Sequence, residues 1–341
     1  MTTRAVHTPS ELQVKQAKQA KQAKQAPAPG PGTGTGRRIL RAVALAATVP
    51  YLCLKAAWLS GSRIGIPEGS VLLEPGLFLT LANALTLAMD ASVILLVLVL
   101  TRPWGRRVPA WLLTVPAFVA TGLLTPILTG FPGQLLIRAL GLGAGGPGKT
   151  YQAPFLDPWV FTVVYTGFTV QGLALAGLFV PYARERWGRR WQGAAGKRLP
   201  PSTGVVAGAA APAGLMVGAV HLYWAFGGTA ALGAERAAEY SAAAGVVSAV
   251  HGACALAAGA GAVLLARGRE WGGRWPLALA WTGSAAALTW GLWMLIASLG
   301  PELDGGEGPT RATLLIYAGQ MITGSLGAVV LTRFLTSRRE G

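Results

Sequence analysis

Long apolar segments alternate with short polar ones along most of the chain. From residue 39 onward, eight apolar segments reach or exceed the ~20 residues that a helix needs to cross a bilayer. Their apolar runs are continuous, whereas the strands of a membrane β-barrel alternate apolar and polar positions. The pattern therefore predicts transmembrane helices, which satisfy all their backbone groups internally. The expected spans are 39–60, 77–100, 108–130, 158–182, 205–227, 241–266, 275–299 and 312–335.

The Lys and Arg residues fall almost entirely in every second gap between these spans. One side carries 23 of the 29, counting the N-terminal arm with Arg41 just inside the first span, the gaps after the second, fourth and sixth spans, and the C-terminal tail with Arg333 just inside the last span. The opposite gaps hold five basic and eight acidic residues, and Lys55 lies within a span. Because cytoplasmic loops are enriched in Lys and Arg, we expect a multi-pass protein of the cell membrane with both termini cytoplasmic.

Composition agrees with a membrane protein. Hydrophobic residues make up 52% of the chain and charged residues 12%, which is too few charges for a soluble protein of 341 residues. A net charge of +16 is also found in proteins that bind nucleic acids. Here the charge lies in a tail and in short loops beside apolar spans, so the expected partner is the lipid bilayer and not nucleic acid. The short loops also argue against a receptor with its own ligand-binding domain.

The chain divides into two similar halves between polar ends. Residues 1–38 contain Lys-Gln-Ala triplets followed by a Pro/Gly/Thr linker, and a three-residue period gives no fixed apolar stripe on a helix. We expect a disordered basic arm, either simply solvated or attracted to anionic lipid. The remaining expected parts are a four-helix half at 39–182, a cytoplasmic linker at 183–204, a second four-helix half at 205–336 and a cytoplasmic tail at 337–341.

The two halves carry similar short segments, which suggests an internal repeat. Lys55 and His221 each lie three residues before a tryptophan near the end of the first helix of their half. The fourth helices read Tyr165-Thr-Gly-Phe-Thr-Val-Gln-Gly172 and Tyr317-Ala-Gly-Gln-Met-Ile-Thr-Gly324. Since four helices return the chain to its starting side, such repeats would be parallel.

A longer segment in the second half carries a family resemblance. At His221-Leu-Tyr-Trp-Ala-Phe-Gly-Gly228 the chain resembles a family of small, uncharacterised four-helix bacterial membrane proteins with an H-x-Y-W-A-x-G-G signature. The resemblance covers about one helix and the turn after it, with a weaker echo at Lys55-Ala-Ala-Trp58. It implies a four-helix membrane unit and carries no chemistry to this chain.

Four ionisable residues lie inside the apolar spans, where charge is costly and usually faces an interior. They are Lys55, Asp90, His221 and His251, and Asn83 lies on the same helix face as Asp90. We take these five residues as a candidate polar site between the two halves. The alternative is structural: Lys55 snorkels or pairs with Asp90, and each histidine bonds across a helix interface.

Three other motifs do not support a cofactor, metal or nucleotide. Gly143–Thr150 matches G-x-x-x-x-G-K-[ST], but this phosphate-binding loop requires a strand before it and a helix after it, and prolines follow here. The histidines lack metal-binding spacing, and convergence with Asp90 would be needed to build such a site. Cys53 and Cys254 are separate and apolar in context, so we expect packing roles rather than reactive thiols.

A glycine series runs along the sixth span. Gly245, Gly252 and Gly259 recur every seven residues, which places them on one face of a helix. Small residues at this spacing let membrane helices approach closely. We therefore expect a packing seam rather than a ligand path.

Three functional classes remain open from the sequence. The first is a permease or carrier with a site near Asp90, His221 and His251. The second is a non-catalytic membrane scaffold or accessory protein whose polar residues only set packing. An integral membrane enzyme that uses these groups for acid–base chemistry is the third and least favoured. No small-molecule or protein partner is indicated.

Overall fold

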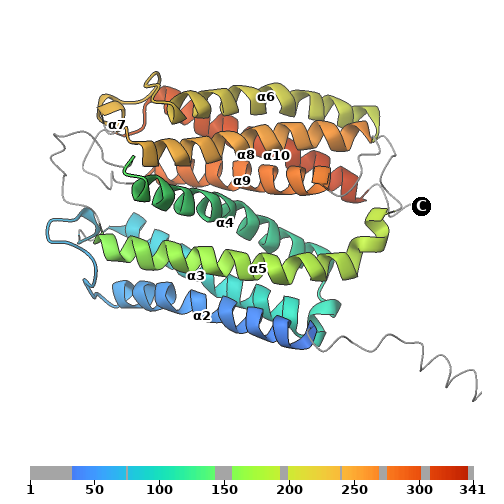
Figure 1. Ribbon diagram of the computed structural model, residues 1–341, viewed down its shortest axis with the longest axis horizontal. Helices are drawn as coiled ribbons and strands as arrows, with labels where there is room; N and C mark the ends of the chain where they lie inside the picture. Colours follow the sequence, from blue (N-terminus) through green and yellow to red (C-terminus); the bar gives the residue numbers. More distant parts are fainter. Residues whose placement is uncertain are drawn as a thin grey trace, which may run out of the picture. The chain divides into compact units, whose positions relative to one another are not determined.

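A computed structural model describes residues 33–73, 76–142, 156–192, 199–238, 240–268, 275–300 and 308–336. Within these ranges the chain forms helices and turns and no strand, and eight helices are long and apolar enough to cross a membrane. This confirms the expected all-α polytopic membrane fold. The helices are α2 (Thr33–Leu59), α3 (Leu77–Thr101), α4 (Ala110–Ala139), α5 (Pro158–Gln192), α6 (Pro201–Ala225), α8 (Ala242–Arg267), α9 (Trp275–Ala297) and α10 (Arg311–Thr336) (Figure 1).

Most helix ends lie within a few residues of the expected ones, with three exceptions. Helix α2 begins at Thr33, six residues before the expected start and inside the arm expected to be disordered. Helix α5 continues ten residues beyond 182, into the segment expected to be a linker, and α4 continues nine residues beyond 130, past Pro132. The length of an apolar run predicts the part of a helix that lies in hydrocarbon. It does not predict how far the helix continues into polar residues. Most of the N-terminal arm (1–32) and the phosphate-loop match (143–150) lie outside the described residues.

Helices α6, α8, α9 and α10 pack closely on one another. Their contacts are built from small residues, and the backbone of one helix often lies where a neighbour's glycine has no side chain. Gly324 of α10 meets the backbone of α9 at Leu288, and Gly283 of α9 meets the backbone of α8 at Ala257 and Ala258. Small residues thereby replace interlocking side chains as the basis of packing, as is common in membrane helices.

The glycine series of α8 forms the seam with α6. A Cβ added at Gly245 would lie 2.6 Å from the carbonyl oxygen of Ala225, and at Gly252 it would lie 3.1 Å from that of Gly218. At Gly259 the distance to the Ala210 carbonyl oxygen would be 2.9 Å. All three contacts are with the α6 backbone, so the expected packing seam is confirmed.

Helix α4 is where α8 and α9 meet the helices of the N-terminal half. It contacts α3 and α5 on one side and α8 and α9 on the other. The indole Nε1 of Trp281 donates to Thr121 Oγ1 at 3.2 Å, and Trp290 Nε1 donates to the Leu123 carbonyl oxygen at 3.1 Å. Gly122, which stands between Thr121 and Leu123 in the sequence, lies against the backbone of α9. Helix α4 therefore makes the main contact between the close-packed helices and the rest.

The helix ends that border the Arg-rich gaps lie together at one end of the helices, which we call the basic end. Arg186 of α5 donates to the carbonyl oxygens of Gly105 and Val108 in the connection between α3 and α4. The amide of Leu199 donates to the Ala266 carbonyl oxygen at the end of α8. The short helices η1 (Val71–Leu73) and α7 (Ala234–Ala238) lie at the opposite end.

The turns that follow α2 and α6 have the same local structure. Trp58 Nε1 donates to the carbonyl oxygen six residues later at 2.8 Å, and Trp224 Nε1 does the same at 2.9 Å. Three residues after each tryptophan stands a glycine with a left-handed backbone, Gly61 at φ 90° and Gly227 at φ 88°. Only glycine adopts this conformation without strain.

A second correspondence links these turns to the fourth helix of each half. Gly65 has φ 72° and Ala231 has φ 71°. The carbonyl oxygen of Gly65 accepts from the amide of Asp157, just before α5, at 2.9 Å. The carbonyl oxygen of Ala231 accepts from the hydroxyls of Thr310 and Thr313, at the start of α10, at 2.6 and 2.8 Å. In each half, the chain that enters the fourth helix binds the turn after the first.

Candidate functional site

A cavity of about 400 Å³ lies between α2, α3, α4, α5 and α9, and we call it the polar cavity. Its size falls within the range of small-molecule sites, which combine apolar walls with a few polar groups. The polar side chains that line it are Tyr51, Lys55, Thr86, Asp90, Ser92, Tyr165 and Gln171. The aromatic walls are formed by Trp58, Phe161, Phe168, Trp290 and Trp293.

Lys55 reaches this cavity from α2 and is 8% exposed. Its Nζ donates to Asn83 Oδ1 of α3 at 2.7 Å. The same atom lies 5.1 Å from the ring centroid of Tyr51 and 5.0 Å from that of Trp58. These rings stand one turn away on the same face of α2, so they surround the ammonium group. The cation is therefore held by one amide oxygen and two aromatic faces, without a carboxylate.

Asp90 lines the cavity from the middle of α3 and is 6% exposed. Its Oδ2 has no hydrogen-bond partner among the described residues. The ion pair found in those residues, between Arg106 and Glu185 at 3.3 Å, is elsewhere and exposed, and Lys55 forms none with Asp90. A buried carboxylate without a bonded partner is costly in a low-dielectric interior.

Gln171 adds a second unpartnered group to the same cavity. It is 1% exposed on α5, and its Nε2 has no hydrogen-bond partner among the described residues. Two residues that line the cavity, Asp90 and Gln171, thus each hold a buried polar atom without a bond to the described chain. Buried polar groups are normally bonded, and among the described residues His221 Nδ1 and Ser284 Oγ are the other buried side-chain atoms without a partner.

The two histidines lie together in a separate cluster on α6 and α8, bridged by Gln320 of α10. His221 Nε2 and Gln320 Oε1 are 3.2 Å apart, as are Gln320 Nε2 and His251 Nδ1. The imidazole rings stack with centroids 5.6 Å apart. Because the amide oxygen only accepts and the amide nitrogen only donates, this arrangement assigns an Nε2–H tautomer to His221 and an unprotonated Nδ1 to His251.

Trp290 of α9 separates the histidine cluster from the polar cavity. Its ring packs edge-on against His251, with centroids 5.3 Å apart, and the same residue lines the cavity. Of the five candidate residues, Lys55 and Asp90 line the polar cavity, and Asn83 supports Lys55 from beside it. His221 and His251 do not line it. The structure therefore divides the candidate residues into two neighbouring groups.

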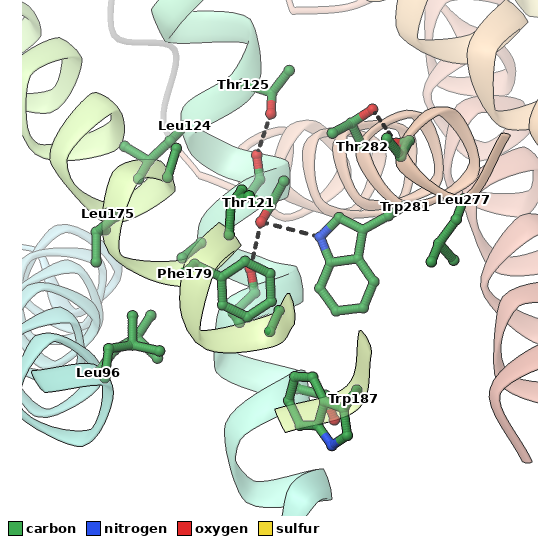
Figure 2. A pocket seen from close by; sticks show the side chains of 18 of the residues that line it. Leu96, Thr121, Leu124, Thr125, Leu175, Phe179, Trp187, Leu277, Trp281 and Thr282 are labelled. Atoms are coloured by element: carbon green, nitrogen blue, oxygen red, sulfur yellow. Dashed lines mark hydrogen bonds between the residues drawn. The ribbon is translucent and has the colours of Figure 1, made fainter. Parts of the chain in front are cut away.

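A second, larger cavity of about 990 Å³ lies between α3, α4, α5, α9 and α10, and we call it the apolar cavity. Figure 2 shows Trp281 at its centre, with Nε1 donating to Thr121. Phe179 stacks on the Trp281 ring with centroids 5.9 Å apart. The Thr121 hydroxyl donates to its own helix, at the Ala117 carbonyl oxygen. Most of the remaining lining is Leu and Ala.

The two cavities adjoin on α4. Ala120 and Leu124 line both of them. The apolar cavity extends from there to the basic end, where Arg184 and Trp187 line it. The polar cavity extends toward the opposite end, where Lys55 lies one turn before the end of α2. Together the cavities occupy most of the height of the bundle on either side of Leu124.

Sequence reasoning did not select Gln171 or Gln320 as site residues, although both stand inside apolar spans. An amide in hydrocarbon needs partners, so its presence was a usable signal. No feature of the sequence indicated the role of Trp290, because tryptophans also serve as interfacial anchors.

Among the described residues, no group of three or more His, Cys, Asp or Glu side chains is placed to hold a metal ion. Comparisons of the chain with protein-family models, with curated proteins and with solved structures found no match.

Proposed function

We propose that this protein is a membrane carrier that binds a small polar solute in the polar cavity. The observation that carries the proposal is that Asp90 and Gln171, two residues of the same cavity wall, each hold a buried polar atom, Oδ2 and Nε2, without a partner among the described residues. A solute with a donor for the carboxylate and an acceptor for the amide would satisfy both. Ionisable residues within membrane spans generally mark such pathways.

The second cavity supports a route across the membrane. A carrier exposes one site alternately to each side, and here the cavities on either side of Leu124 share part of their lining. Helix α4, which carries Leu124, also contains Pro116, Pro126 and Pro132. Each proline removes a backbone hydrogen bond and weakens the helix locally. Movement of α4 is therefore the proposed means of joining the cavities.

We further propose that the two halves are parallel four-helix repeats, with both termini cytoplasmic and the cell membrane as location. The shared turn after α2 and α6, with its tryptophan hydrogen bond and left-handed glycine, supports a duplication. The partial resemblance of the second half to small four-helix membrane proteins agrees with it. Repeats of this kind are a common origin of carriers.

The alternative is a scaffold or accessory protein. The close-packed helices α6, α8, α9 and α10, taken alone, favour this alternative. There the histidines are bridged by Gln320 and the helices pack through glycines, which is how a purely structural bundle would be built. The enzyme alternative has less support, because neither histidine lines the polar cavity or the apolar cavity.

The experiment that tests the carrier uses accessibility and needs no known solute. Leu124→Cys would be made in a chain whose Cys53 and Cys254 are replaced by Ser, and labelled in sealed vesicles of either orientation with a membrane-impermeant thiol reagent. A carrier exposes position 124 to both sides in turn, so labelling is expected from both faces. Val97→Cys is the matched control, since Val97 is fully buried and lines neither cavity. Labelling of position 124 from one face only, or from neither, would refute the carrier and favour the scaffold.

A further inference from the structure

The apolar cavity has a charged mouth. Of the described residues that line it, Arg184 is the one that carries a charge, and it lies at the basic end. Trp111 and Trp187 line the same end. Tryptophan rings favour the headgroup level of a bilayer, so this mouth lies where lipid headgroups meet the hydrocarbon.

The guanidinium of Arg184 is available for a ligand. Arg186, half a turn further along α5, donates to Gly105, Val108 and Tyr182. Arg184, in contrast, makes no hydrogen bond or ion pair with any described residue and is exposed. An arginine in this position presents a planar array of donors that matches a phosphate group.

The rest of the lining suits a hydrocarbon chain. Thr282 and Thr332 donate their hydroxyls to carbonyl oxygens of their own helices, so they offer no free donor. On α4 the lining runs from Ala110 to Leu128. At ~1.5 Å per residue this distance is about 27 Å, which exceeds the ~15 Å of one leaflet's hydrocarbon. A lipid chain that enters at the basic end therefore has room for its full length.

We propose that the apolar cavity binds an anionic phospholipid from the leaflet at the basic end. Arg184 binds the phosphate, and an acyl chain lies beside Trp281 and Phe179 toward Leu124. This site is distinct from the polar cavity but lies in the cavity that the proposed solute route also uses, and its test measures lipid binding without any measurement of transport. A bound chain beside Leu124 would also fill the space that adjoins the polar cavity.

Native mass spectrometry of the full chain tests this proposal. The purified protein would be incubated with equal amounts of phosphatidylglycerol and phosphatidylcholine that carry the same acyl chains. One arginine beside an anionic headgroup is worth about fivefold in affinity, so the wild type should retain phosphatidylglycerol with about that preference. Arg184→Gln should abolish the preference, and Arg184→Lys should keep most of it.

Two control variants distinguish binding in this cavity from a general attraction of anionic lipid to the basic end. Arg107→Gln removes an exposed basic residue at the same end that does not line the cavity, and it should leave the preference unchanged. Ala176→Trp fills the cavity and should remove the retained lipid, whereas Leu173→Trp, on the exposed face of α5 outside the cavity, should not. No preference in the wild type, an equal loss in Arg107→Gln, or retention in Ala176→Trp would overturn the proposal. A protein that forms dimers and retains no lipid would also overturn the proposal.

Discussion

Two buried glutamines provide a direct test of which polar groups hold the fold together. Gln320 and Gln171 are both 1% exposed and lie on α10 and α5. Gln320 bridges His221 and His251, whereas Gln171 has an unpartnered Nε2. Replacement of each by leucine keeps side-chain volume similar. We expect Gln320→Leu to destabilise the protein clearly and Gln171→Leu to have little effect on stability.

The magnitude follows from the bonds that are lost. A hydrogen bond between membrane helices is worth about 0.6 kcal/mol on average, so the two bonds of Gln320 contribute about 1.2 kcal/mol. Its removal also leaves imidazole nitrogens of His221 and His251 buried without a partner, which adds about 1–3 kcal/mol. The expected loss for Gln320→Leu is therefore about 1–4 kcal/mol. For Gln171→Leu the expected change is near zero, or a slight gain.

Equilibrium unfolding in mixed micelles, followed by helical circular dichroism, measures both changes under one set of conditions. The comparison of two glutamine-to-leucine variants cancels effects common to such a substitution. If Gln171→Leu loses as much free energy of unfolding as Gln320→Leu, the histidine bridge has no special role in stability. A loss below about 0.5 kcal/mol for Gln320→Leu would lead to the same conclusion.

Three further outcomes are expected in the same unfolding assay. Gly324→Ala should cost about 1–3 kcal/mol because its methyl group would meet the backbone of α9, whereas Gly208→Ala, with open space around it, should be neutral or stabilising; equal effects would contradict the packing. Trp58→Phe and Trp224→Phe should each cost about 1 kcal/mol, because each removes one indole hydrogen bond, and a cost in only one would show that the turns differ in energy. Asp90→Asn should not lower stability, because the carboxylate oxygen has no partner to lose, and a drop above about 1 kcal/mol would reveal one.

The transmembrane spans could be predicted from the sequence because hydrocarbon thickness sets a minimum length for an apolar run. The end of α5 could not be, since residues 183–192 are rich in Arg and Trp and form helix beyond the apolar part. The minimum length of an apolar run predicts a span but does not predict how far its helix continues into polar residues. Helix α4 extends past Pro132, a residue type that membrane helices tolerate at an interior position.

The candidate residues could be selected from the sequence because charges are rare in apolar spans. Lys55 and Asp90 line one cavity, and Asn83, which shares a face of α3 with Asp90, accepts a hydrogen bond from Lys55. Periodicity shows which residues share a face of one helix, but not which helix that face meets. The separation of His251 from Asp90 depends on Trp290 of α9, a helix that sequence spacing could not orient.

One position accounts for the different character of the two halves if they are repeats as proposed. Gln320 lies three residues after Tyr317, and its amide closes the gap between two histidines. Three residues after Tyr165 stands Phe168, which packs edge-on against Tyr51 with centroids 5.0 Å apart and cannot bridge polar groups. The first half therefore has no amide at the corresponding place, and its charged side chains remain apart around a cavity. A duplicated bundle in which one copy keeps the bridging amide and the other replaces it with an aromatic ring would gain a binding site in one half while the other keeps its packing.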